Sequence, residues 1–287
     1  MELPYVRVSP KSRLGSYLPT AFVSEGALLI VLKSYFDRSG QEDAAFMTLS
    51  GIAATDEMWG EIEENWLGIL RLTDPKATYM HMVEAVPLRG EFSKDKGWDD
   101  DKVSGIINSL ISYLSMIPKD KYYQIACTID MTAYRKLLGE SYQLDSPVDI
   151  CNECCVERMM HWYLFEYKGG FDVEASYYFD QGEPFEPVFR AKWNRELVRA
   201  SELNEYTIWS HIKHVGEAIM RDTPGLQVAD MLAWANNREE SKVSKRYEVL
   251  ALAMKRLMPS KWITWDEAKL RKIYRPLISK PYGQEQY

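Results

Sequence analysis

Three apolar runs, widely separated in this chain of 287 residues, each end at an aspartate: Asp37, Asp130 and Asp180. Short apolar runs of this kind are typical of buried strands. In an open α/β sheet, ligands bind beyond the carboxyl ends of the strands, so acids at strand ends can meet at one edge although they are far apart in sequence. Each aspartate alone has a simpler explanation, because aspartate also begins turns and caps helices.

The runs belong to an alternation of strands and helices that follows an initial hairpin. The hairpin is predicted from strands at 27–36 and 44–54 around a turn at 37–40. An α/β fold is favoured, with a mixed sheet and helices on its faces. Further strands are expected over 122–129 and 173–179, and apolar residues at helical spacing predict helices that begin at Thr55 and Asp99 and others over 147–167, 184–200 and 226–237.

One domain accounts for most of the chain. We expect an N-terminal arm over residues 1–25, a single domain over 26–240, and a basic, mostly helical extension of the same domain over 241–287. A chain of this length is ample for a large core, so it needs no disulfide or metal to hold it together.

The formal net charge of −7 argues against indiscriminate binding to nucleic acid by charge alone. Nucleic acid is still a possible partner, because a bound divalent metal would offset carboxylates locally. Residues 1–15 lack the long apolar stretch of an export signal, and the aliphatic run at 27–32 is too short to span a bilayer. We therefore expect a cytoplasmic protein without a membrane partner, whose four cysteines are free thiols.

A further acid, Asp230, lies inside an apolar helical segment at 227–235. Of its four neighbours three and four positions away, only Gln227 is polar, and the others are Leu226, Ala233 and Trp234. This face of the helix is therefore expected to be buried or to line a cleft. A buried carboxylate without a partner costs several kcal/mol or more, so it needs a proton, a cation or a metal. The alternative is a structural aspartate that bonds to the backbone or to an arginine.

Carboxylates gathered in this way suit hard cations such as Mg²⁺ and Mn²⁺. Two such ions about 4 Å apart can activate a water and stabilise a leaving oxygen in phosphodiester cleavage. Several acids are needed because one carboxylate cannot hold two dications.

Four segments of the chain resemble the signature blocks of the domain of unknown function 3800 family. They read YFDRSG at 35–40, HMVE at 81–84 followed by GW at 97–98, FDQGEPF at 179–185 and PGLQVADMLAW at 224–234. The blocks occur in the expected order and span residues 31–238. The resemblance implies that the domain over 26–240 is ribonuclease-H-like, with helices on both faces of the sheet and a metal-ion active site.

The resemblance also implies which residues form this site. Asp37, Asp180 and Asp230 would be the metal-binding acidic core. His81 would lie at the rim, although a histidine in this context can also be a satisfied residue of a strand or turn. Glu84 and Glu183 would be additional acids. Asp130 has weaker support and is not included.

One position departs from the family pattern. The residue after the first aspartate is usually an acid, and here it is Arg38. The change removes a negative charge beside the site and adds a cation that can bind phosphate. Whether this member cleaves a substrate is therefore open.

Three cysteines, Cys151, Cys154 and Cys155, together with His161, raise the alternative of a zinc site. Structural zinc normally takes four ligands, often from two paired knuckles. Here a single CxxC pair lies inside a predicted helix. We expect buried thiols without zinc.

These observations lead to a metal-dependent nuclease, or a nuclease-like phosphoryl-transfer enzyme, that acts on DNA or RNA. Service to mobile elements or to phage defence is implied by the resemblance alone. The alternative, which Arg38 favours, is a non-catalytic ribonuclease-H-like module that binds nucleic acid or a protein partner. A homo-oligomer is also open. A small-molecule enzyme has no support of its own, because the chain has no glycine-rich phosphate loop and no nucleophilic serine motif.

Overall fold

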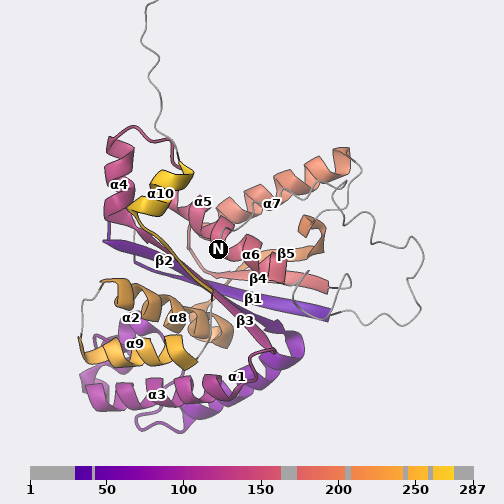
Figure 1. Cartoon of the computed structure of the whole chain (residues 1–287). Coiled ribbons are helices and arrows are strands. Elements are labelled where there is room, and N and C mark those ends of the chain that lie inside the picture. The colour runs from indigo at the N-terminus through magenta and orange to yellow at the C-terminus, as the bar shows by residue number, and fades with distance from the viewer. Residues whose placement is uncertain are drawn as a thin grey trace, which may run out of the picture.

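The structure is a computed structural model that describes residues 30–40, 43–162, 173–203, 208–241, 245–257 and 261–274. The N-terminal arm predicted over 1–25 lies outside the described residues. The described strands form one mixed sheet in the order β5-β4-β1-β2-β3-β6, with helices on both faces (Figure 1). The strands are β1 (Ile30–Ser39), β2 (Phe46–Thr55), β3 (Tyr122–Asp130), β4 (Val173–Asp180), β5 (Ile212–Ala218) and β6 (Lys261–Trp265).

Strand direction brings the carboxyl ends of β1 and β4 to the same edge. β2 is antiparallel to both β1 and β3, whereas β1 pairs parallel with β4, β4 with β5, and β3 with β6. In the described sheet, β2 alone therefore runs against the others. Phe36 lies opposite Phe179 in the β1–β4 register, so Asp37 and Asp180 follow at the same level. The predicted α/β fold with a mixed sheet is confirmed.

One layer of helices, below the sheet in Figure 1, packs against the face that carries Tyr35. Its first long helix begins at Thr55, whose hydroxyl accepts a hydrogen bond from the N–H of Met58 at 3.2 Å. Asp99 caps the next one, accepting from Lys102 N at 2.8 Å, so the predicted starts of both helices are confirmed. The layer comprises α1 (Asp56–Arg71), α2 (Met82–Ala85), α3 (Asp100–Met116), α8 (Pro224–Ser241), α9 (Lys245–Leu257) and the 3₁₀ turns Gly90–Phe92, Lys94–Lys96 and Met220–Asp222.

The second layer covers the face that carries Phe36 and Phe179 (Figure 1). Successive strand residues point to opposite faces, so Tyr35 and Phe36 belong to different cores. By the same alternation, Asp37 faces the α8 layer and Arg38 the other. The second layer comprises α4 (Met131–Gly139), α5 (Pro147–Asn152), a π-helical turn (Glu153–Glu157), α6 (Arg158–His161), α7 (Phe185–Glu202), the 3₁₀ turn Ile208–His211 and α10 (Glu267–Ile273).

Several elements differ from the predicted ones. The single helix predicted over 147–167 is divided by a π-helical turn, and its end lies outside the described residues. β5 was not predicted. The C-terminal extension contains a strand as well as helices, and this strand, β6, extends the sheet beside β3. No helix in the described ranges is both long enough and apolar enough to cross a membrane.

Candidate active site

Three predicted site acids come together near the ends of β1 and β4, on the face of the sheet that α8 covers. Asp180 is the last residue of β4, and Asp37 lies near the end of β1. Asp230 lies in the second turn of α8, which packs against β1 and β2. The side chains of Asp37 and Asp230 lie close enough to affect each other's pKa, and each is only 5% exposed. Asp180 is close enough for its charge to act on both.

Burial raises the pKa values of these acids, and for Asp37 and Asp230 the neighbouring acids add to the effect. Burial raises the pKa of Asp37 well above its usual range, and the charges of Asp230, Glu183 and Asp180 act in the same direction. Burial also raises the pKa of Asp230, to about 6, with Asp180 adding to the effect. Two acids buried side by side resist being ionised together, so a proton or a cation is favoured at this pair.

Backbone N–H groups hold two of the acids in place. Met82 N donates to Asp230 Oδ2 at 2.6 Å, at the start of α2. Met220 N donates to Asp180 Oδ1 at 3.1 Å, from the 3₁₀ turn that precedes α8. Sequence reasoning did not find these donors, because a backbone N–H carries no side-chain signal.

His81 lies beside the acids and is partly exposed. Its side chain is 28% exposed, and its charge when protonated lowers the pKa of both Asp230 and Asp180. On its other side, His81 Nδ1 is 3.8 Å from Glu84 Oε1. It therefore stands between the acid pair and a second, outer group of residues.

Glu84 belongs to that outer group. It accepts hydrogen bonds from Tyr79 Oη at 2.6 Å and from the N–H of Glu91 at 3.0 Å. Burial raises the pKa of Glu84, but these hydrogen bonds outweigh it and leave the pKa lowered. Arg221 lies over the Tyr79 ring at 4.7 Å and donates to its hydroxyl at 3.2 Å. Glu84 thus fixes the loop around His81.

Glu183 and Arg38 form an ion pair at the edge of the sheet. Arg38 Nε lies 2.8 Å from Glu183 Oε2, and Arg38 Nη2 donates to Oε1 at 3.3 Å. Both side chains are less than one-fifth exposed. Burial raises the pKa of Glu183, and the arginine opposes this effect. The cation beside Asp37 is therefore engaged by a candidate site acid.

Asp130 has the simpler role that aspartate often takes. Its Oδ1 accepts hydrogen bonds from the N–H groups of Thr132 and Ala133, which caps α4. Asp130 ends a strand, as Asp180 does, but it does not belong to the acid group of Asp37, Asp180 and Asp230.

The acids suit a hard divalent ion by their chemistry, since they are carboxylates whose pKa values burial raises. In the described part of the chain, no three Asp, Glu, His or Cys side chains are arranged to hold a metal ion as they stand. Asp37 and Asp230 would bind such an ion, with Asp180 beside them.

Among models of protein families, curated proteins and solved structures, none matches this chain. The resemblance drawn from the four sequence blocks stays a prediction.

The four cysteines gather in the opposite layer. All are buried free thiols, and Cys127 of β3 lies in hydrogen-bonding contact with Cys151, Cys154 and Cys155. Trp265 Nε1 donates to Cys154 Sγ at 3.0 Å. The absence of zinc stays a prediction that elemental analysis would test.

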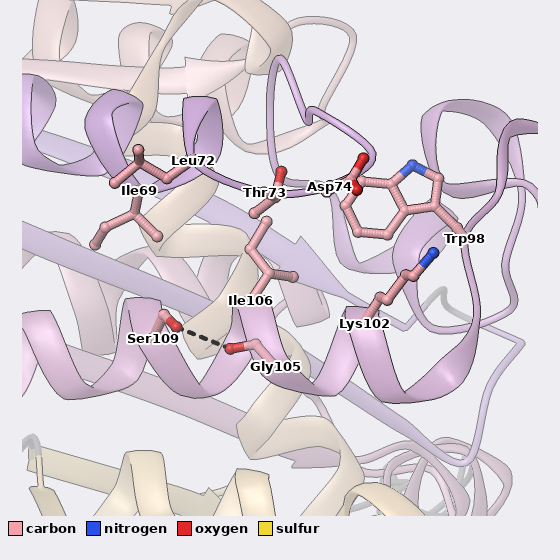
Figure 2. Close-up of a pocket in the computed structure, with 9 residues that line it drawn as sticks. All are labelled: Ile69, Leu72, Thr73, Asp74, Trp98, Lys102, Gly105, Ile106 and Ser109. Atoms are coloured by element: carbon pink, nitrogen blue, oxygen red, sulfur yellow. Dashed lines mark hydrogen bonds between the residues drawn. The ribbon is translucent and has the colours of Figure 1, made fainter.

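A groove of about 370 Å³ lies between α1 and α3 (Figure 2). Trp98, Ile106 and the aliphatic residues Ile69 and Leu72 line it, together with Thr73, Asp74, Lys102, Gly105 and Ser109. This volume is sufficient for a small ligand. The predicted site residues do not line the groove, so it is separate from the acids.

Proposed function

We propose that this chain is a ribonuclease-H-like enzyme that cleaves DNA or RNA, or transfers phosphoryl groups, with Mg²⁺ or Mn²⁺ bound by Asp37, Asp180 and Asp230. The observation that carries the proposal is the Asp37–Asp230 pair, two buried acids that lie close together beside a third. Burying acids together is costly unless a proton or a cation compensates them. A hard dication compensates several carboxylates at once.

The arrangement of the sheet supports the ribonuclease-H-like part of the proposal. The fold opens with the β1–β2 hairpin, and parallel strands with helices follow on both sides of it. Asp37 and Asp180 come from adjacent parallel strands, and α8 adds Asp230 over the same face. Three of the four sequence blocks thus supply one acid each.

The chain's own residues divide the chemical work. Asp37 and Asp230 are the most buried acids and would hold the metal, which when bound activates water and stabilises a leaving oxygen. Asp180 is more exposed and would complete the metal's protein ligands from the solvent side of the site. His81, partly exposed at the rim, would donate a proton to the leaving oxygen. A cytoplasmic location, and service to mobile elements or phage defence, rest on the sequence alone.

The test is incubation with labelled single- and double-stranded DNA and RNA in Mn²⁺ or Mg²⁺. Asp230→Asn is compared with Asp120→Asn, which makes the same change of charge at an exposed turn. We expect cleavage by the wild type and by Asp120→Asn but not by Asp230→Asn. Cleavage that persists in EDTA or in Asp230→Asn would contradict the proposal.

The second candidate is a non-catalytic module that binds nucleic acid or a partner protein. Arg38 favours this candidate. It stands where the resemblance leads us to expect an acid, and it pairs with Glu183, another candidate site acid. This candidate predicts nucleic-acid binding that is equal in Mn²⁺ and in EDTA, unchanged by Asp230→Asn, and without cleavage.

A further inference from the structure

Gln227, one helical turn before Asp230, is fully buried and uses its whole amide in hydrogen bonds. Its Oε1 accepts from Trp66 Nε1 at 2.8 Å and from Met80 N at 2.9 Å. Its Nε2 donates to Met220 O at 3.1 Å and to Arg221 O at 3.3 Å. Two acceptor positions and two donors are all that a glutamine side chain offers.

The two backbone segments that Gln227 joins are the segments that hold the acids. On one side, Met80 is two residues from Met82, whose N–H donates to Asp230. On the other side, Met220 accepts from Gln227 through its carbonyl and donates to Asp180 through its own N–H. One side chain therefore sets the separation between the backbone donors of both acids.

The same segments carry His81 and a surface arginine. His81 lies between Met80 and Met82, and Arg221 follows Met220. At the surface, Arg221 ties the segments together again through its contacts with Tyr79. In the buried interior, Gln227 joins the same two segments through Met80 and Met220. It also contacts α1 through Trp66.

We propose that Gln227 is a positioning residue, which fixes Asp230 and Asp180 relative to one another through the Met80–Met82 and Met220–Arg221 segments. A glutamine is required because the position needs an acceptor toward Met80 and a donor toward Met220. Buried polar groups that orient metal ligands commonly affect metal affinity 10- to 100-fold. The geometric part of this inference is independent of the proposed function, whereas its effect on metal affinity rests on that function.

The first test measures hydrogen exchange at the backbone amides of Met82 and Met220 by NMR. Gln227→Glu keeps the shape and the acceptor but removes the donor toward Met220. Exchange at Met220 should accelerate about tenfold or more, while exchange at Met82 changes less. Gln227→Met removes both halves and should accelerate both amides. Trp66→Phe is the matched control, because it removes one donor to Gln227 and leaves the links to Met80, Met220 and Arg221.

The second test is the Mn²⁺ dissociation constant of the folded proteins. We expect it to rise 10- to 100-fold in both Gln227 variants and less than threefold in Trp66→Phe. Uniform acceleration of all amides, or equal effects in Gln227→Glu and Trp66→Phe, would overturn the inference and leave Gln227 a packing residue. If the wild type binds no Mn²⁺ while exchange at Met220 still responds selectively, positioning stands and the proposed function fails.

Discussion

The acids of this protein differ, residue by residue, in what compensates their charge. Asp130 accepts two backbone N–H groups at the start of α4. Glu183 pairs with Arg38. Asp37 and Asp230 are buried close together and receive backbone N–H groups, and burial raises the pKa of both. Each arrangement predicts a different response to losing the charge.

Replacing Asp230 with Asn should leave the protein in EDTA as stable as the wild type or more stable. Asn keeps the size and much of the hydrogen bonding, and it removes the repulsion with Asp180 and Asp37. Urea unfolding measures the change. If Asp230 instead belonged to a structural ion pair, the same substitution would cost about 3–5 kcal/mol.

The stability of the wild type in EDTA should fall relative to Asp230→Asn as pH rises from about 4 to 7. The folded pKa of Asp230 is raised to about 6, above the value of about 3.9 for an unfolded aspartate. Its contribution to stability is therefore fully present below pH ~4 and is lost as pH rises through the folded pKa. The size of the change is on the order of 2–3 kcal/mol. Urea unfolding of both proteins across this range checks it, and a flat difference would refute the raised pKa.

Arg38 and Glu183 should show coupled effects on stability. Arg38→Gln alone leaves a largely buried carboxylate without its cation, and Glu183→Gln alone strands the guanidinium. We expect each to cost about 1–3 kcal/mol, between an exposed pair and a fully buried one. The double variant should recover part of the loss. Additive losses in a double-mutant cycle would show that the pair contributes nothing.

At the scale of elements, the described part of the C-terminal segment packs into the domain: α9 belongs to the α8 layer, whereas β6 joins the sheet and α10 the second layer. β6 pairs in parallel with β3, so it covers an edge of the sheet. α10 then packs beside α4 and inserts Leu270, which is fully buried, into the core. Lys136 of α4 pairs with Glu267 of α10 at 2.9 Å. β6 and α10 are therefore structural parts of the domain.

Leu270→Ala should destabilise the protein by about 2–5 kcal/mol, because it opens a cavity where α10 packs. Ile273→Ala, on the same helix but 55% exposed, is the matched control and should change stability by less than about 0.5 kcal/mol. Urea unfolding separates the two. Equal small effects would show that α10 is peripheral to the fold.

For the molecule as a whole, the sheet separates two cores with different contents. The α8 layer contains the acid pair and the Gln227 links, whereas the opposite layer contains the cysteines. A ligand on the acids therefore acts on the α8 layer, and it stabilises the whole domain if the domain unfolds as one unit.

Mn²⁺ at a hundred times its dissociation constant should raise the free energy of unfolding by about 2.7 kcal/mol. The gain should disappear in Asp37→Asn and Asp230→Asn and persist in Asp120→Asn, because only the first two remove ligands. Thermal or urea unfolding with and without Mn²⁺ measures it. A gain that all variants retain would place the bound ion elsewhere.

Local sequence determined much of the fold. Helical spacing and the caps at Thr55 and Asp99 predicted α1 and α3, because these features depend on residues within a few positions of each other. Apolar runs predicted β1, β2, β3 and β4 for the same reason. β5 was missed, because its buried and exposed residues do not alternate and a register shift interrupts its pairing with β4.

Tertiary structure decided which of the candidate acids belong together. Asp130 and Asp180 both end apolar strands, yet the register of β1 against β4 brings only Asp180 beside Asp37. The engagement of Arg38 by Glu183 joins residues 145 positions apart, and the four hydrogen bonds of Gln227 join α1, the loop before α2 and the turn before α8. The sequence alone determined the residue types and local elements. The contacts between distant segments depend on how strands pair and helices pack, and no local pattern encodes them.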